Sequence, residues 1–374
     1  MCKKIFLFIV CLMLSTADVS AGEPKISALA AILTEKESGR VLWQKNADKP
    51  MPPASTTKIM TAVTVLETID PDTVITADSE AAAAPKVRMG LENGEKLTAR
   101  QLLYALMLQS SNDAAIALAK GTCGSTEKFC ELMNKKAAEL GCTDTHFVTP
   151  NGLDADGHHT TAHDMALMAA YALDNAEFVR IIQTKNITFS SNKKSYSIYN
   201  HDRFLSEYDG ALGIKTGFTG KAGHCFAGAA QRGGTTLVSV VFASGWGTGG
   251  KEAKWRDTKA LMDYGFKNYK YTQAVNKGAL VCDVPVGGGR ESTAGLVIGS
   301  DFGTALKNGE KYNITCTVPA RLSAPVHKGD VLGSARITTS GGFCASVPVI
   351  ADKDVDKNTF LENFCRLAAF LTAQ

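Results

Sequence analysis

The stretch Pro53-Ala54-Ser55-Thr56-Thr57-Lys58-Ile59-Met60 lies where a proline-rich loop gives way to an apolar helical pattern. Ser55 and Lys58 are three positions apart, so on a helix their side chains share one face and can touch. A serine hydroxyl becomes an effective nucleophile when a neighbouring base takes its proton. The pair therefore indicates a serine nucleophile with a lysine base. The spacing alone is common, because Ser190 and Lys193 repeat it in a polar segment that we expect at a hairpin tip.

Two further motifs follow in order, Ser110-Ser111-Asn112 at a break between two helical patterns and Lys215-Thr216-Gly217 in a strand pattern. Lys58 can act as a base only as a neutral amine, a form that burial and a nearby cation such as Lys215 favour. A helix start at Ser55 also places backbone N–H groups near a developing oxyanion. Ser110 and Asn112 are candidates for relaying a proton and orienting a substrate amide.

The third motif is expected on an edge strand. There Thr216 can bind a substrate carboxylate, and Gly217 lets an extended peptide approach closely. Each motif has a simple alternative, since Ser55 and Ser110 can cap helices and Lys215 can be a solvated strand residue. Three such coincidences in one chain are improbable, so we interpret the set as a catalytic site.

The first part of the chain predicts an α+β fold, an antiparallel sheet covered by helices. Strand patterns occur at both ends of this part, and helical patterns occur between them and after them. The predicted strands are 26–33, 40–43, 187–189, 196–199, 212–215, 226–230 and 236–243. The predicted helices are 56–66, 99–108, 113–120, 129–140, 161–173 and 255–266.

Composition divides the chain into four parts, 1–21, 22–270, 271–351 and 352–374. The third part has short alternating strands between glycines and prolines, which predicts a small all-β domain. The last part is amphipathic, and one helical face carries Phe360, Leu361, Phe364, Leu367, Ala368 and Leu371. This face predicts either a helix on a membrane surface or a helix docked on the β-rich domain.

The N-terminus has the pattern of a signal peptide. Lys3 and Lys4 precede a short apolar segment, and Val19-Ser20-Ala21 offers small residues for cleavage. We therefore expect an exported protein. In an oxidising compartment some cysteines can pair, and Cys316 with Cys344, both in strand-like segments, is a plausible pair, although we favour buried free thiols with at most one bridge.

Several other functions find no support in the sequence. A formal net charge of +3 without a basic run gives no indication of nucleic-acid binding. His158, His159 and His163 lack the His-Glu-x-x-His pattern of a metallopeptidase, so we expect solvated or capping histidines and no metal. No cofactor is expected.

With these motifs in place, the chain resembles D-alanyl-D-alanine carboxypeptidases, the low-molecular-mass penicillin-binding proteins of the serine peptidase type. Penicillin-binding proteins and class A β-lactamases share such a motif set, although their middle motif is Ser-Asp-Asn where this chain has Ser111. The resemblance covers most of residues 26–269. It includes four further stretches: Lys45-Asn46-Ala47-Asp48, 109–115, Asn151-Gly152-Leu153-Asp154 and 213–223.

The resemblance implies an activity at the bacterial cell envelope, on the outer face of the cytoplasmic membrane or in the periplasm. The enzyme would remove the terminal D-alanine from peptidoglycan stem pentapeptides through an acyl-enzyme on Ser55. The oxyanion would lie between the backbone N–H groups of Ser55 and Phe218. Penicillins and other β-lactams would acylate the same serine.

Two positions depart from the family pattern. Phe218 stands where members often carry His or Tyr, and Lys254 stands where a cation, often Arg, helps to hold the substrate carboxylate. Lysine binds a carboxylate less directionally than arginine. Two alternatives stay open, a β-lactamase and a penicillin-binding sensor or wall-binding module with little turnover. Against the first, no convincing Glu-x-x-x-Asn loop lies between Asn112 and Lys215.

Overall fold

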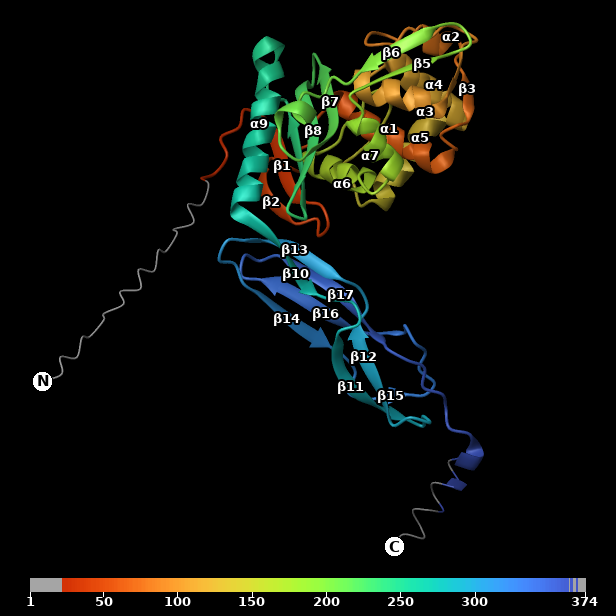
Figure 1. The fold of residues 1–374 in the computed structure, drawn as a ribbon, viewed down its shortest axis with the longest axis vertical. Helices are drawn as coiled ribbons and strands as arrows, with labels where there is room; N and C mark the ends of the chain where they lie inside the picture. The colour runs from red at the N-terminus through yellow and green to blue at the C-terminus, as the bar shows by residue number, and fades with distance from the viewer. Residues whose placement is uncertain (1–21, 363, 366–367, 369–374) are drawn as a thin grey trace, which may run out of the picture.

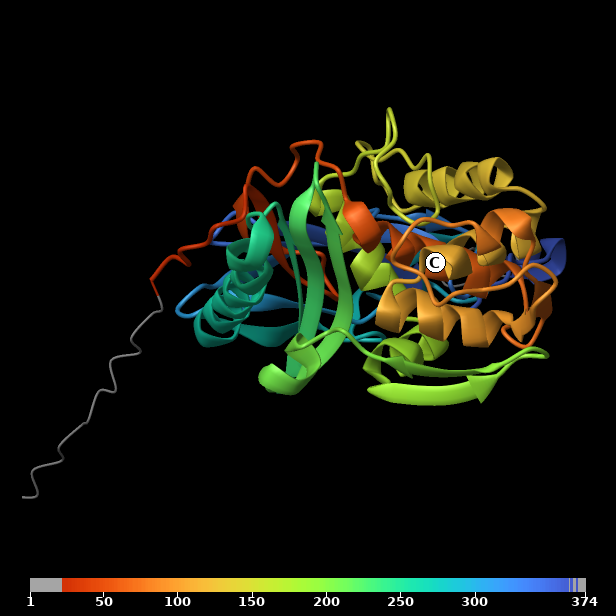
Figure 2. The same cartoon turned by 90° about the horizontal axis from the view of Figure 1, so that it is seen from above.

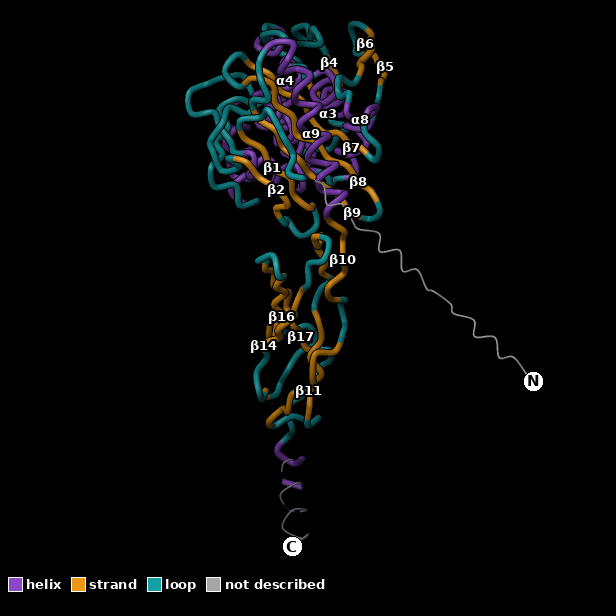
Figure 3. Tube along the Cα trace, turned by 90° about the vertical axis from the view of Figure 1, so that its left-hand side faces the viewer, coloured by secondary structure: helices purple, strands orange, loops and turns teal. Residues whose placement is uncertain are grey.

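The computed structural model describes residues 22–362, 364–365 and 368. The predicted signal segment 1–21, and Leu367 and Leu371 of the predicted tail face, lie outside these residues. A body of helices and sheet carries a slender β domain at one end (Figures 1 and 3). Within the described residues, no helix has the length and apolar character needed to cross a membrane.

The body is built on one antiparallel sheet of five strands, in the order β2-β1-β9-β8-β7. The strands come from the two ends of the domain sequence, as expected. They are β1 (Ala30–Glu35), β2 (Val41–Lys45), β7 (Ala211–Thr219), β8 (Gly223–Arg232) and β9 (Thr235–Phe242). The Lys-Thr-Gly motif lies on β7, which is an edge strand of this sheet. The prediction of an antiparallel sheet covered by helices is thus confirmed.

Helices cover both faces of this sheet (Figure 2). On β1, Ala31 and Leu33 pack toward Trp255 of α9 (Gly247–Asn268), whereas Ala30 and Ile32 pack toward the helices of the other face. All six residues of β1 are buried. A strand covered on both faces needs apolar side chains on both, which explains the apolar run from Ala30 to Leu33.

Most of the remaining helices form the second layer of the body. They are α1 (Lys58–Thr68), α2 (Ser79–Ala82), α3 (Ala99–Tyr104), α4 (Asn112–Cys123), α5 (Thr126–Glu139), α6 (Ala162–Ala172) and α7 (Ala176–Gln183). The short α8 (Phe204–Glu207) instead packs through Phe204 on the side of α9. Two small ribbons flank them: β3 (Val74–Thr76) with β4 (Lys96–Thr98), and β5 (Asn186–Ser190) with β6 (Ser195–Tyr199). We did not predict α7. Helix α9 begins at Gly247 rather than at 255. The prediction placed its start too late because the glycine-rich first turns carry no apolar pattern.

The β domain begins where α9 ends, with β10 (Tyr269–Val275) paired to β13 (Phe302–Lys307). A six-stranded sheet follows in the order β14-β16-β17-β12-β11-β15. Its strands are β11 (Leu280–Gly287), β12 (Thr293–Ile298), β14 (Tyr312–Thr317), β15 (Leu322–Ser323), β16 (Val331–Thr339) and β17 (Cys344–Ala351). Beyond Ala351 the chain still pairs with this domain, through Val355 with Val326 and Lys357 with Gly289.

The predicted pairing of Cys316 with Cys344 is wrong. Strand β16 lies between β14, which carries Cys316, and β17, which carries Cys344. Both thiols are exposed, and none of the cysteines in the described residues forms a disulfide. The sequence shows that both segments are strands, but strand order depends on contacts between distant parts of the chain.

A buried ion pair joins the body to the β domain. Arg40, in the turn before β2, donates from Nη2 to Glu310 Oε1 at 2.7 Å and from Nη1 to the Ala305 carbonyl at 2.8 Å. Both charged side chains are less than a tenth exposed. Burial would raise the pKa of Glu310, but hydrogen bonds from Arg40, Thr339 and the Lys307 backbone outweigh it and lower this pKa to about 2.

We expect Glu310→Ala to destabilise the protein by about 3–5 kcal/mol, because it leaves the buried Arg40 guanidinium without its charge partner. Urea unfolding measures this loss. Since the folded pKa of Glu310 is depressed, its stabilisation exists above the usual carboxyl pKa and is lost as the pH falls toward about 2. Glu291→Ala removes an exposed ion pair with Lys353 and serves as the control. Equal unfolding midpoints for the two variants would contradict the expectation.

Candidate active site

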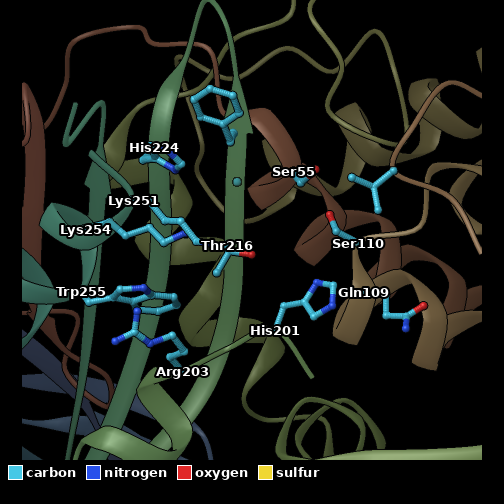
Figure 4. Close-up of a pocket in the computed structure, with 13 residues that line it drawn as sticks. Ser55, Gln109, Ser110, His201, Arg203, Thr216, His224, Lys251, Lys254 and Trp255 are labelled. Carbon is cyan, nitrogen blue, oxygen red and sulfur yellow. The ribbon is translucent and has the colours of Figure 1, made fainter. Parts of the chain in front are cut away.

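A cavity of about 550 Å³ opens between the edge of the sheet and the helical layer. Ser55, Gln109 and Ser110 lie on its helical side, and Thr216 and Lys254 face them from β7 and α9 (Figure 4). The structure thus brings residues from all three sequence motifs to one place. Its full lining is Ser55, Val87, Gln109, Ser110, His201, Arg203, Thr216, Gly217, Phe218, His224, Lys251, Lys254 and Trp255.

Ser55 lies in a 3₁₀ turn, Ala54–Thr57, that leads directly into α1. We expected the helix to begin at Thr56; the α-helix begins at Lys58. Ala54 has a φ of 49°, a left-handed conformation that is rare for a residue with a side chain. Gly152 packs against this turn so closely that a Cβ there would lie 2.0 Å from the Ala54 carbonyl oxygen. The neighbouring loop therefore fixes the strained turn that presents the serine.

The Lys58 amine has three close neighbours. Its Nζ lies 2.9 Å from Ser55 Oγ, 2.8 Å from Asn112 Oδ1 and 2.6 Å from the Asn151 carbonyl oxygen. The two carbonyl oxygens only accept hydrogen bonds, so they take both hydrogens of a neutral amine. The lone pair of that amine is then left for the Ser55 hydroxyl proton. This is the arrangement that a lysine base needs.

The surroundings of Lys58 favour its neutral form. The side chain is fully buried, and burial followed by the charge of Lys215 lowers its pKa well below the ordinary value, against the opposing charge of Asp113. A buried amine next to a second cation loses its proton more readily.

Ser110 and Asn112 occupy the break between two helices. Ser110 has a φ of 66° and ends a π-helical turn, Ala105–Gln109, which directs its side chain into the cavity. Asn112 is the first residue of α4 and does not line the cavity. Its amide accepts from Lys58 and donates from Nδ2 to the Pro85 carbonyl at 3.1 Å. In this structure it orients Lys58, whereas we expected it to orient a substrate amide.

Strand β7 brings the Lys-Thr-Gly motif past the nucleophile. Thr216 lines the cavity, while the buried Lys215 donates to the Thr216 carbonyl at 3.1 Å. A Cβ on Gly217 would lie 3.0 Å from the Ser55 nitrogen and 3.1 Å from Ala54 Cβ. Glycine is therefore needed for the strand to approach the Ser55 turn, a reason additional to the substrate approach that we predicted.

Phe218 forms part of the rim. Its ring is 49% exposed and lies 4.3 Å, centroid to centroid, from the ring of His224 on β8. The Phe218 side chain offers no hydrogen bond, so only its backbone N–H can serve an oxyanion. Its exposed ring instead adds an apolar surface to the cavity.

Lys254, the position where the family resemblance implies a carboxylate-binding cation, lines the cavity. Its side chain is buried, and its Nζ lies 4.6 Å from the centre of the Trp255 ring. Burial lowers its pKa to about 8, against the opposing charge of Asp202. Burial and the charge of Lys254 together lower the pKa of Lys215 to about 7. Lys254 lines the cavity, whereas Lys215, which we expected to bind substrate, is buried and is not among the lining residues.

Sequence reasoning missed several residues of this site. The Asn151 carbonyl holds Lys58, and the signal for it was the resemblance of the 151–154 stretch to the family. Asp113 accepts from the backbone N–H groups of Met89, Gly90 and Leu91, which fixes the loop that carries Val87. His201, Arg203, Lys251 and Trp255 also line the cavity. No local motif marks these residues, because their proximity arises from the fold.

His158 has a structural role. His158 is buried, accepts from the Val148 N–H through Nδ1 at 3.0 Å, and places Nε2 3.0 Å from Thr57 Oγ1. Burial lowers its pKa to about 4. The expectation of a solvated or capping histidine is therefore wrong for His158, which supports the turn before Lys58. No group of potential metal ligands occurs among the residues that the structure describes.

Comparison with known proteins agrees with this geometry. Residues 17–245 match the family model for D-alanyl-D-alanine carboxypeptidase, and residues 269–357 match that for the C-terminal domain of penicillin-binding protein 5. The chain is 32% identical to the D-alanyl-D-alanine carboxypeptidase DacF of Bacillus subtilis, over 89% of this chain and 87% of that protein. It is also 32% identical to DacC of Escherichia coli, over 95% of this chain and 91% of that protein.

Solved structures extend the agreement to both domains. Penicillin-binding protein 5 of Haemophilus influenzae superposes with a TM-score of 0.79 at 27% identity, over 90% of this chain and all of that one. The likeness therefore includes both the body and the β domain. The chain belongs to the family of serine-type D-alanyl-D-alanine carboxypeptidases that includes penicillin-binding protein 5.

Proposed function

We propose that this protein removes the terminal D-alanine from peptidoglycan stem pentapeptides through an acyl-enzyme on Ser55. The observation that carries the proposal is the 2.9 Å approach of Ser55 Oγ to a lysine amine whose two other neighbours only accept hydrogen bonds. This leaves the amine able to take the serine proton. The family relationship supports the reaction, and the geometry supports Ser55 as its nucleophile.

The substrate binds along the outer edge of β7, which is an edge strand of the sheet. An extended peptide pairs with an exposed strand through backbone hydrogen bonds, which positions its carbonyl beside Ser55. The terminal carboxylate binds Thr216 and the ammonium group of Lys254, and the buried Lys215 adds positive charge nearby. The backbone N–H groups of Ser55 and Phe218 stabilise the oxyanion.

The chemistry then proceeds in two balanced steps. Ser55 Oγ forms an ester with the penultimate D-alanine while Lys58 takes the hydroxyl proton, and that proton passes to the leaving amine of the terminal D-alanine, with Ser110 as a relay. A water then attacks the ester, Lys58 takes a proton from it, and Ser55 regains its hydrogen. β-Lactam antibiotics acylate Ser55 in the same way, because their strained amide occupies the position of the scissile bond.

A D-alanine release assay on a peptide ending in Lys-D-Ala-D-Ala tests the proposal. We expect release by the wild-type protein together with penicillin labelling. Labelling without release would instead identify the penicillin-binding sensor or wall-binding module, and rapid hydrolysis of penicillin would identify the β-lactamase. Against the β-lactamase, the described residues that line the cavity include no Asp or Glu to activate a deacylating water.

We further propose that the protein is exported and rests on a membrane surface through its C-terminal segment. Residues 360–362 are helical, and Phe360, Leu361 and Phe364 are 86%, 69% and 58% exposed. Apolar side chains so exposed at the end of the β domain suit the interface of a bilayer. Cosedimentation with anionic vesicles should be lost when Phe360 and Phe364 are replaced by serine; unchanged cosedimentation would contradict this role.

A further inference from the structure

The Phe218 ring takes no part in the proposed reaction, which uses only the backbone N–H of this residue. Phe218 lines the cavity and is 49% exposed. Its ring packs on His224, its partner across β7 and β8, which Figure 4 shows on the cavity wall. The two ring centroids are 4.3 Å apart, and the ring planes are tilted by 30°. An aromatic ring that is exposed inside a substrate cavity is a candidate contact for the substrate itself.

The ring of Phe218 is supported from behind by an imidazole that is itself fixed. His224 is 9% exposed, and its Nε2 lies 3.1 Å from the Gly247 carbonyl oxygen, which can only accept a hydrogen bond. The His224 backbone N–H also donates to the Gly245 carbonyl at 2.9 Å. The imidazole therefore holds the Phe218 ring in a defined orientation, so a ligand that packs on the ring pays little entropy to order it.

The register of β7 places this ring on the acyl side of the substrate. Thr216 and Phe218 are two positions apart on the strand, so their side chains share the face that lines the cavity. Gly217, between them, is level with the nucleophile, because a Cβ there would lie 3.0 Å from the Ser55 nitrogen. In the proposed reaction the leaving D-alanine binds Thr216 through its carboxylate. The part of the peptide that stays on the enzyme therefore lies toward Phe218.

A peptide bound in this way runs antiparallel to β7. Its terminal D-alanine lies opposite Thr216, its penultimate D-alanine lies opposite Gly217, and the residue before them lies opposite Phe218. Directly opposite L-residues of an antiparallel pair place their side chains on the same face, close enough to touch. In a peptide ending in Lys-D-Ala-D-Ala this residue is an L-lysine. Its methylene chain can lie along an apolar ring while its polar end stays in water.

We propose that Phe218 is a specificity-determining residue whose ring binds the aliphatic side chain of the residue that precedes D-Ala-D-Ala. The proposal rests on the proposed function, which sets the direction of the peptide along β7. A single exposed aromatic side chain is common on protein surfaces. What distinguishes Phe218 is its fixed support by His224 and its register with the substrate. The His or Tyr that family members often carry here offers a polar group, whereas the apolar ring of Phe218 favours an aliphatic chain.

The test compares two N-acetylated peptides, one ending in Nε-acetyl-Lys-D-Ala-D-Ala and one ending in L-Ala-D-Ala-D-Ala. For the wild type, kcat/KM for D-alanine release should be about tenfold higher with the acetyl-lysine peptide, mainly through a lower KM. In Phe218→Ala this ratio should fall close to one, whereas Phe218→Tyr keeps the ring and should keep the ratio. The ratio cancels any general loss that comes from disturbing the Phe218 backbone N–H.

The matched control is Tyr199→Ala. Tyr199 lies on β6, is 60% exposed and is not among the residues that line the cavity, so its loss should leave the ratio unchanged. An unchanged ratio in Phe218→Ala, a lost ratio in Phe218→Tyr or the same fall in Tyr199→Ala would each overturn the proposal.

A second measurement needs no variant, should Phe218→Ala fail to fold. Wild-type kcat/KM is measured with alanine, norvaline and norleucine before D-Ala-D-Ala, and each added methylene should raise it by about two- to fourfold. A flat series contradicts the role of Phe218. Failure of the proposed function is recognised separately, because the wild type would then release D-alanine from none of these peptides.

Discussion

Replacement of Ser55 by alanine is expected to abolish both D-alanine release and covalent labelling by penicillin. Loss of a catalytic serine removes the acyl-enzyme route, which reduces kcat by a factor of about 10⁴ or more. The fold should persist, because Ser55 is only partly buried and its hydroxyl contacts Lys58 alone among the described residues. Peptide hydrolysis, penicillin labelling and thermal unfolding of the purified variant measure these three outcomes.

The chain offers a matched control in another Ser-x-x-Lys pair, Ser190 and Lys193. The Ser190 hydroxyl lies 2.8 Å from that of Ser195 on the neighbouring strand, and Lys193 Nζ donates to the Asn93 carbonyl at 2.7 Å. This pair lies at the tip of an exposed hairpin, so Ser190→Ala should leave both activities unchanged. Labelling retained by Ser55→Ala would show that another residue is the nucleophile.

Replacement of Lys58 by methionine is expected to reduce acylation by peptide and by penicillin by a factor of about 10²–10⁴, the usual effect of losing a general base. In the wild type, acylation should rise as the pH rises through the lowered pKa of Lys58, because only the neutral amine accepts the Ser55 proton. The variant should lose this acidic limb. Stopped-flow acylation with a chromogenic β-lactam across the pH range measures both effects.

Methionine has a similar length and suits a fully buried site, so the Lys58→Met variant should remain folded. Lys193 is the exposed lysine of the Ser190/Lys193 pair. The matched control is therefore Lys193→Met, which should acylate like the wild type. Near-normal acylation by Lys58→Met with the acidic limb preserved would mean that the base is a different group.

Local patterns predicted the body of this protein well. The period of apolar residues located most helices, and strands at both ends of the domain indicated an antiparallel sheet between helical layers. The Lys-Thr-Gly motif was expected on an edge strand, and β7 is one. Local patterns failed where no apolar period exists, as in the glycine-rich start of α9.

The site was harder to predict because much of it is assembled by the fold. Ser55, Ser110, Thr216 and Lys254 come together as the motif order and spacing indicated. The Asn151 carbonyl and the buried His158 depend on contacts between segments that no short motif links. The same limit explains the wrong pairing of Cys316 with Cys344, whose strands are separated by β16.

The central claim is that Ser55 carries the acyl group. Its most direct test is peptide mapping by mass spectrometry after a short reaction with penicillin and, separately, with a peptide ester ending in D-alanine. We predict that both acyl groups are found on the peptide that contains Ser55 and that neither is found in the Ser55→Ala variant. An acyl group on Ser110, or on any peptide without Ser55, would contradict the account.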